Sequence, residues 1–280
     1  RRTMCFNGWM SGGFAALGLL VAGFVEFKTC NRQLAIGVFF YFTMEFLQAI
    51  QYLYLASDLG TPTCDTFVNK FLTILGFIHI CLQPYFCHYI NEALSQLPSK
   101  NNTAEHNAKL KKYRDQYHTI KRLCLIGGFL IFMRWPMSYV QGWNVQGGDT
   151  ALTRTEWLRG KEVCTFKSQA MVHLGWSVPM ADPTYNIQGV GLHCFLMFAP
   201  FFALFEKKAM VIQGLFLYIT GPWVASLITT NLLEQASIWC FFSIAQISIM
   251  LFLIRETLVT RWGKSGLITG EKNVEKKKKK

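Results

Sequence analysis

Charged residues are scarce in this sequence. Asp, Glu, Lys and Arg make up 16% of the 280 residues, and hydrophobic residues make up 51%, whereas an ordinary soluble domain has about 25% charged residues. The apolar residues come in long blocks, each close to the roughly 20 residues that a helix needs to cross the hydrocarbon of a bilayer. The composition therefore argues against a soluble domain and predicts one helical membrane domain.

The motifs of several enzyme and receptor classes are also absent. The nine cysteines include no Cys-x-x-Cys pair, and no His-x-x-His or Glu-x-x-His spacing supports a metal site. No P-loop, glycine-rich phosphate cradle or serine nucleophile elbow is present. The last apolar block has no lysine to bind retinal, and the signatures of hormone and odorant receptors and of ceramidase-type zinc hydrolases are missing. The sequence therefore predicts no catalytic residue, no metal and no identifiable cofactor.

Seven apolar blocks predict the fold class, an all-α integral membrane bundle of seven transmembrane helices. The predicted spans cover about residues 8–27, 34–56, 68–90, 120–140, 187–205, 209–229 and 234–254. Together they form a transmembrane domain over residues 1–260, and residues 261–280 form a basic, disordered tail. In the first span, small residues that allow close helix approach are Gly12, Gly13, Gly18 and Gly23.

The basic residues predict the orientation. Seven of them lie between Lys100 and Arg122, and the chain ends in five lysines. Basic loops stay in the cytoplasm, which places the N-terminus outside and the C-terminus inside. Confinement of the charge to one loop and the tail favours anionic lipid as the partner and argues against nucleic acid. Protein partners and a homo-oligomer stay open.

Glu45 lies near the middle of the second span, where a charge costs roughly 2.5–3.5 kcal/mol on insertion scales. Glu45, Gln48 and Tyr52 are three and four residues apart, so they form one polar stripe that should face the bundle interior.

Spans of similar length bring their central residues to one depth, so other spans contribute to the layer of Glu45. We predict an intramembrane polar site whose members are Glu45, Gln48, His79, Gln83 and Gln246. A pair between Glu45 and His79 could exchange a proton, bind a cation or anchor a polar ligand. It could also be a buried pair that only fixes helix register.

A second polar layer is expected at the outer ends of the spans. It would form a vestibule lined by Arg134, His173, Asp182, His193 and Glu234. Arg134 could instead pair with an acidic residue of a loop. On the same side, Cys64 and Cys164 could form a disulfide, which requires an oxidising compartment. Three tryptophans in the long fourth connection suit an interfacial belt, namely Trp143, Trp157 and Trp176.

Four short segments carry a resemblance. They are Met4-Cys-Phe-Asn7, Met44-Glu-Phe-Leu-Gln48, Gly76-Phe-Ile-His79 and His173-Leu-Gly-Trp-Ser-Val-Pro179. On these segments the chain resembles an uncharacterised family of multi-span membrane proteins that begin Met-Cys-Phe, found in algae, fungi and large DNA viruses. The resemblance covers nearly the whole chain and implies the architecture, but it implies no activity. It also implies that Met4 is the biological start.

The predicted function is that of a transporter, channel or sensor for a small solute or proton, with an interior path centred on Glu45 and His79. One alternative is a non-catalytic membrane subunit that packs on partner proteins, lipids or pigments. Another is a membrane-embedded lipid-modifying enzyme, which requires His173, Asp182 and His193 to converge.

Overall fold

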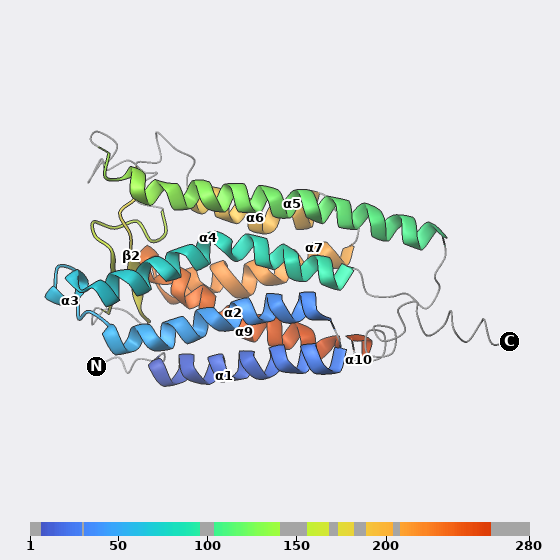
Figure 1. The fold of residues 1–280 in the computed structure, drawn as a ribbon, viewed down its shortest axis with the longest axis horizontal. Coiled ribbons are helices and arrows are strands. Elements are labelled where there is room, and N and C mark those ends of the chain that lie inside the picture. Colours follow the sequence, from blue (N-terminus) through green and yellow to red (C-terminus); the bar gives the residue numbers. More distant parts are fainter. Residues whose placement is uncertain are drawn as a thin grey trace.

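The computed structural model describes residues 7–29, 31–95, 104–140, 156–167, 173–181, 189–203 and 208–258. This part of the chain is predominantly helical. The long helices lie side by side along one direction, and a small two-stranded sheet lies at one end of them (Figure 1). We call that end the cap end and the opposite end, where the last helix finishes, the tail end.

A helix lies in each of the seven stretches expected to be spans. The main helices are α1 (Gly8–Phe24), α2 (Arg32–Gln51), α4 (Phe67–Ser95), α5 (Ala104–Met137), α6 (Gly189–Ala203), α7 (Lys208–Tyr218), α8 (Val224–Ile228) and α9 (Leu232–Leu253). The shorter elements are η1 (Val25–Thr29), η2 (Tyr52–Tyr54), α3 (Pro62–Asp65), η4 (Ile219–Trp223) and α10 (Arg255–Thr257). The π-helical η4 joins α7 to α8 and contains Pro222, whose missing N–H disrupts regular α-helical bonding.

Five helical segments of the described chain are long and apolar enough to cross a membrane. They are residues 8–29, 32–54, 67–95, 210–228 and 232–253. The other two predicted spans fall in α5 and α6. The apolar half of α5 also carries Lys121, Arg122 and Arg134, and α6 offers only a shorter apolar stretch, Gly191–Phe202.

The helix α5 begins at Ala104, well before the predicted span at residue 120. Its first part is charged, with Lys111, Lys112 and Arg114 exposed, and it extends past the other helices at the tail end (Figure 1). Lysine, arginine and glutamate are good helix formers. Hydropathy therefore identifies the apolar half of this helix but not its charged extension.

The glycines of α1 do not act as a group in close packing. A Cβ added at Gly12, Gly13 or Gly23 would have no neighbour within 4 Å, whereas one at Gly18 would lie 3.1 Å from both Phe42 and Ile244 side chains. A much closer approach joins α4 to α5, because a Cβ at Gly128 would lie 2.3 Å from the backbone oxygen of Cys81.

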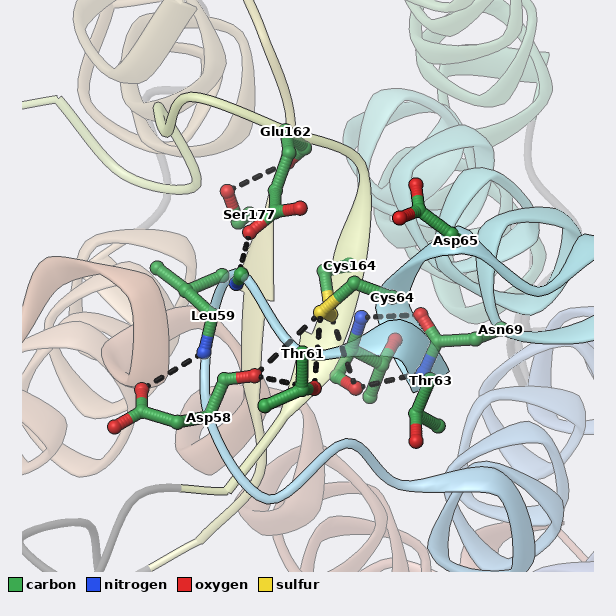
Figure 2. The surroundings of a disulfide bond; sticks show 12 residues. Asp58, Leu59, Thr61, Thr63, Cys64, Asp65, Asn69, Glu162, Cys164 and Ser177 are labelled. Atoms are coloured by element: carbon green, nitrogen blue, oxygen red, sulfur yellow. Dashed lines mark hydrogen bonds between the residues drawn. A yellow bond between two sulfur atoms is a disulfide. The ribbon is translucent and has the colours of Figure 1, made fainter.

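The cap consists of α3 and two short antiparallel strands, β1 (Cys164–Phe166) and β2 (Gly175–Ser177). A disulfide joins Cys64 of α3 to Cys164 of β1, as Figure 2 shows. Beside it, the Asn69 side chain donates to the backbone oxygen of Thr165 at 2.8 Å and accepts from the Thr165 N–H at 3.0 Å. The covalent bond and these hydrogen bonds fasten β1 to the start of α4.

Trp176 is not part of an interfacial belt, because it is buried. Trp176 is 1% exposed, packs over Gly76, and donates its indole N–H to Gln51 at 3.1 Å. Trp157 is half-buried and donates to Gln235 at 2.9 Å, and Trp143 lies outside the described residues. Trp176 is part of the core because β2 runs inward between helix ends, which hydropathy along a loop does not reveal.

Candidate functional site

Polar residues line the contact between α2 and α9, which run in opposite directions through the bundle (Figure 1). On α2 they recur every three or four residues and share one face, whereas on α9 they recur every third residue and so wind gradually around the helix. The set consists of Tyr41, Glu45, Gln48 and Tyr52 on α2 and η2, and Glu234, Ser237, Cys240 and Ser243 on α9. We call it the α2–α9 seam. All of its members except Tyr52 are buried.

Glu45 occupies the middle of the seam. Its side chain is 0% exposed, and within the described residues neither carboxyl oxygen makes a hydrogen bond of regular geometry, although the Ser11 hydroxyl lies close enough to interact with it. Its polar neighbours are Ser11 of α1, Cys240 of α9 and Tyr52. An isolated carboxylate is very costly in a low-dielectric interior. A carboxyl group in this place is therefore stable only when it carries a proton or when a cation or water molecule contacts it.

His173 closes the seam at the cap end. Its Nε2–H donates to Gln48 Oε1 at 2.8 Å, and its Nδ1 accepts from the Tyr52 hydroxyl. The Gln48 amide in turn donates to the backbone oxygen of Ser237 at 3.4 Å. These bonds select the neutral imidazole with its proton on Nε2. Burial also lowers the pKa of His173 to about 3 from its ordinary value of 6.5.

The segment before β2 is fixed to the start of α9. The His173 backbone N–H donates to the Glu234 carboxylate, and Ser237 Oγ donates to the backbone oxygen of Leu174 at 2.5 Å. Glu234 lies in the first turn of α9, where the helix dipole stabilises a negative charge. His173 thus reaches the seam on a segment held at both its backbone and its side chain.

A cavity lies next to the seam toward the tail end. It lies between α2, α4, α6, α7 and α9 and is partly open to the outside. Its polar lining consists of neutral groups, namely Tyr41, Asn91, Gln213, Ser243 and Gln246. Gln213 donates to Asn91 Oδ1 at 2.8 Å, and Gln246 donates to Thr220 Oγ1 at 2.7 Å. The cavity therefore meets the seam at Tyr41 and Ser243, one turn from Glu45.

The five residues of the predicted intramembrane site are not one cluster. Glu45 and Gln48 belong to the seam, and Gln246 lines the cavity. His79 instead stacks on Phe40 at 3.8 Å between ring centroids and bonds to the Phe40 backbone oxygen at 2.8 Å. Phe40 precedes Glu45 by five residues, or about 140° around the helix, so His79 meets a different side of α2. Glu45 and His79 are therefore not in contact, although their positions along the helices predict the same depth in the membrane.

Gln83 also stands apart from Glu45. Its backbone oxygen accepts from the Tyr41 hydroxyl at 3.4 Å, which links α4 to the seam. Its own amide is buried, and neither amide atom has a hydrogen-bond partner among the described residues.

The predicted outer vestibule is divided into separate environments. Arg134 forms a bidentate ion pair with Glu156, and its Nη2 also donates to the Ala181 backbone oxygen at 2.7 Å. His173 packs against Phe241, whereas His193 packs against Trp239. Two residues of separation place those rings on opposite sides of α9. Asp182 lies outside the described residues.

The residues that the sequence did not single out are those of α9 that face Glu45. They are Ser237, Cys240 and Ser243, which lie at every third position between the two predicted residues Glu234 and Gln246. Serine and cysteine are common in packed membrane helices, so each alone carries little signal. A strict spacing of three winds around an α-helix, so only their residue types, compared with the stripe on α2, could have pointed to them. Across the described chain, no group of three or more His, Cys, Asp or Glu residues could hold a metal ion.

These features define a helical protein with five helices able to cross a membrane and a buried polar seam between two of them. The chain belongs to a family of unknown function, DUF5765, whose sequence model matches residues 9–259. That agrees with the resemblance to an uncharacterised family, while the range of organisms stays a prediction. No curated protein and no solved structure matches the chain.

Proposed function

We propose that this chain crosses a membrane seven times and that the α2–α9 seam passes or senses protons, with Glu45 as the group that gains and loses the proton. The observation that carries the proposal is the buried Glu45 carboxyl, which makes no hydrogen bond of regular geometry among the described residues. Ionisable residues inside a membrane domain are functional candidates by default.

The two crossings beyond the five apolar segments would be α5 and α6. Both lie within the bundle beside α4, and α5 runs along its length (Figure 1). Exposed basic residues at the tail end of α5, including Lys111, Lys112 and Arg114, support a cytoplasmic tail end next to anionic lipid. The Cys64–Cys164 disulfide supports a cap end on the oxidising side.

A proton fits the seam better than a larger solute. His173 bonds to Gln48, whose amide donates to the Ser237 backbone oxygen, and on the tail-end side Tyr41 and Ser243 border the cavity. A proton needs only groups that donate and accept in turn, and water in the cavity would bring it to within one turn of Glu45. Glu45 is the titratable group between the cavity and His173.

The test is proton flux into vesicles that contain the purified full chain and a trapped pH-sensitive dye. We expect Glu45→Gln to lower the flux by about tenfold or more, because the amide cannot carry the proton. The matched control is Glu26→Gln, the same chemical change in η1 and outside the seam, and it should leave the flux unchanged. Equal fluxes in wild type and Glu45→Gln would contradict the proposal and favour a non-catalytic membrane subunit.

The structure offers no comparable support for a lipid-modifying enzyme. That function requires His173 and His193 to act on one substrate, but their rings pack on opposite sides of α9. The buried Arg134–Glu156 pair also occupies the basic group that such a vestibule would offer to a lipid phosphate.

A further inference from the structure

A groove on the outside of the cap end is much larger than the cavity beside the seam. Its volume is about 1050 Å³. Its walls come from the start of α4, the end of α5 and the segment before and after the cap strands, and they include Phe67, Lys70, Phe71, Ile74, Trp135, Tyr139, Lys161 and Glu162. The groove therefore lies where two bundle helices meet the cap.

One wall of the groove is apolar and aromatic. Phe67 and Phe71 stack with ring centroids 5.8 Å apart, and both are exposed, by 79% and 50%. Across from them the Trp135 indole donates to the Tyr139 hydroxyl at 3.3 Å. Amphipathic Trp and Tyr side chains concentrate at the depth of lipid headgroups. This wall suits the upper part of an acyl chain.

The rim of the groove carries charges of both signs. Lys70 pairs with Asp65 at 3.0 Å, and these side chains are 44% and 81% exposed. Lys161 is exposed, and Glu162 accepts from the Gly60 N–H at 2.6 Å. Two lysines and two carboxylates give the rim no net charge, so it offers partners for a phosphate and for an ammonium group together.

We infer that this groove binds a zwitterionic phospholipid, with the phosphate on Lys70 and Lys161, the amine toward Asp65 and Glu162, and an acyl chain along the aromatic wall. An anionic lipid has no amine to place beside Asp65 and Glu162, so its phosphate would give the neutral rim a net negative charge. The inference rests on the membrane crossing proposed above, but it does not depend on proton movement through the seam.

The first test is native mass spectrometry of the full chain titrated with phosphatidylethanolamine and, separately, phosphatidylglycerol. The variant Lys70→Ala/Lys161→Ala should bind phosphatidylethanolamine about fivefold more weakly, a modest loss because exposed ion pairs are weak. The control Lys111→Ala/Lys112→Ala removes the same charge at the tail end of α5 and should bind it as the wild type does. The inference is overturned if phosphatidylglycerol binds the wild type as tightly as phosphatidylethanolamine does, or if both double variants lose binding equally.

A second measurement uses the conservative Trp135→Phe change in case the double variant does not fold. In phosphatidylglycerol vesicles that contain a minor share of phosphatidylethanolamine brominated on its acyl chains, the quenched part of the fluorescence should be smaller for Trp135→Phe than for the wild type, since exposed Trp9 and Trp223 contribute equally to both. If Trp135 is no better quenched than the other tryptophans, the groove holds no lipid chain. Because neither readout measures proton flux, failure of this site and failure of the proposed function can be told apart.

Discussion

Arg134 and Glu45 are both charged residue types that the bundle buries almost completely, yet their surroundings differ. Arg134 is 1% exposed and bonds to both oxygens of Glu156 and to a backbone oxygen. Glu45 is 0% exposed, and among the described residues its oxygens make no hydrogen bond of regular geometry. Buried charges that serve only structure are normally paired and hydrogen-bonded. The difference indicates that Arg134 stabilises the fold, and it agrees with the proposed role of Glu45 as the group that gains and loses a proton.

The largest expected effect comes from breaking the Arg134 pair. Arg134→Met removes the bidentate pair and leaves the buried Glu156 carboxylate with the longer contact to Arg159 at 3.8 Å, so we expect a loss of about 3–5 kcal/mol in the free energy of unfolding. Denaturant or thermal unfolding in mild detergent measures it. The double change Arg134→Met/Glu156→Leu should recover most of the loss, and a double variant as unstable as the single one would contradict the account.

Removing the cap disulfide should cost somewhat less. Cys64 and Cys164 are 100 residues apart in sequence, and a cross-link over such a distance typically contributes about 2–4 kcal/mol by restricting the unfolded chain. We expect Cys64→Ala/Cys164→Ala to unfold at a lower temperature than the wild type in the absence of reductant. The control is the buried free cysteine Cys81, since Cys81→Ala should not alter the response of the protein to reductant.

The stability that His173 contributes through its hydrogen bonds to Gln48 and Tyr52 should decrease in acid. The unfolded His173 takes up a proton as the pH falls below 6.5, whereas burial lowers the pKa of the folded residue to about 3. Its contribution to stability is therefore complete above pH 6.5 and is lost progressively as the pH falls toward 3. Between pH 7.5 and 5 this amounts to about 2 kcal/mol. His173→Gln should show a correspondingly smaller pH dependence in thermal unfolding, and an unchanged dependence would contradict it.

Much of the fold follows from hydropathy alone, because each of the seven apolar blocks contains a helix. Hydropathy does not predict the charged start of α5, because the exposed part of the helix around Lys111 and Lys112 forms no apolar block. The stripe of Glu45, Gln48 and Tyr52 was visible because helical periodicity is local and regular.

The partners of that stripe could not be read from the sequence. Depth along a span is set by residue number, but rotation about the helix axis and the choice of neighbour are set by packing. His79 has the depth of Glu45 and yet faces Phe40. Likewise, Glu156 reaches Arg134 from a connecting segment 22 residues away, and such contacts leave no periodic signal.

The most direct test of the comparison between the two buried residues measures stability and proton flux in the same reconstituted samples of wild type, Glu45→Gln and Arg134→Met. Glu45→Gln should lose flux while its unfolding free energy stays within about 1 kcal/mol of wild type, because the amide keeps the shape of the side chain and an oxygen that can accept from Ser11. Arg134→Met should lose stability. If Glu45→Gln instead unfolds as readily as Arg134→Met and keeps the wild-type flux per folded molecule, Glu45 is a structural residue and the proposed function is wrong.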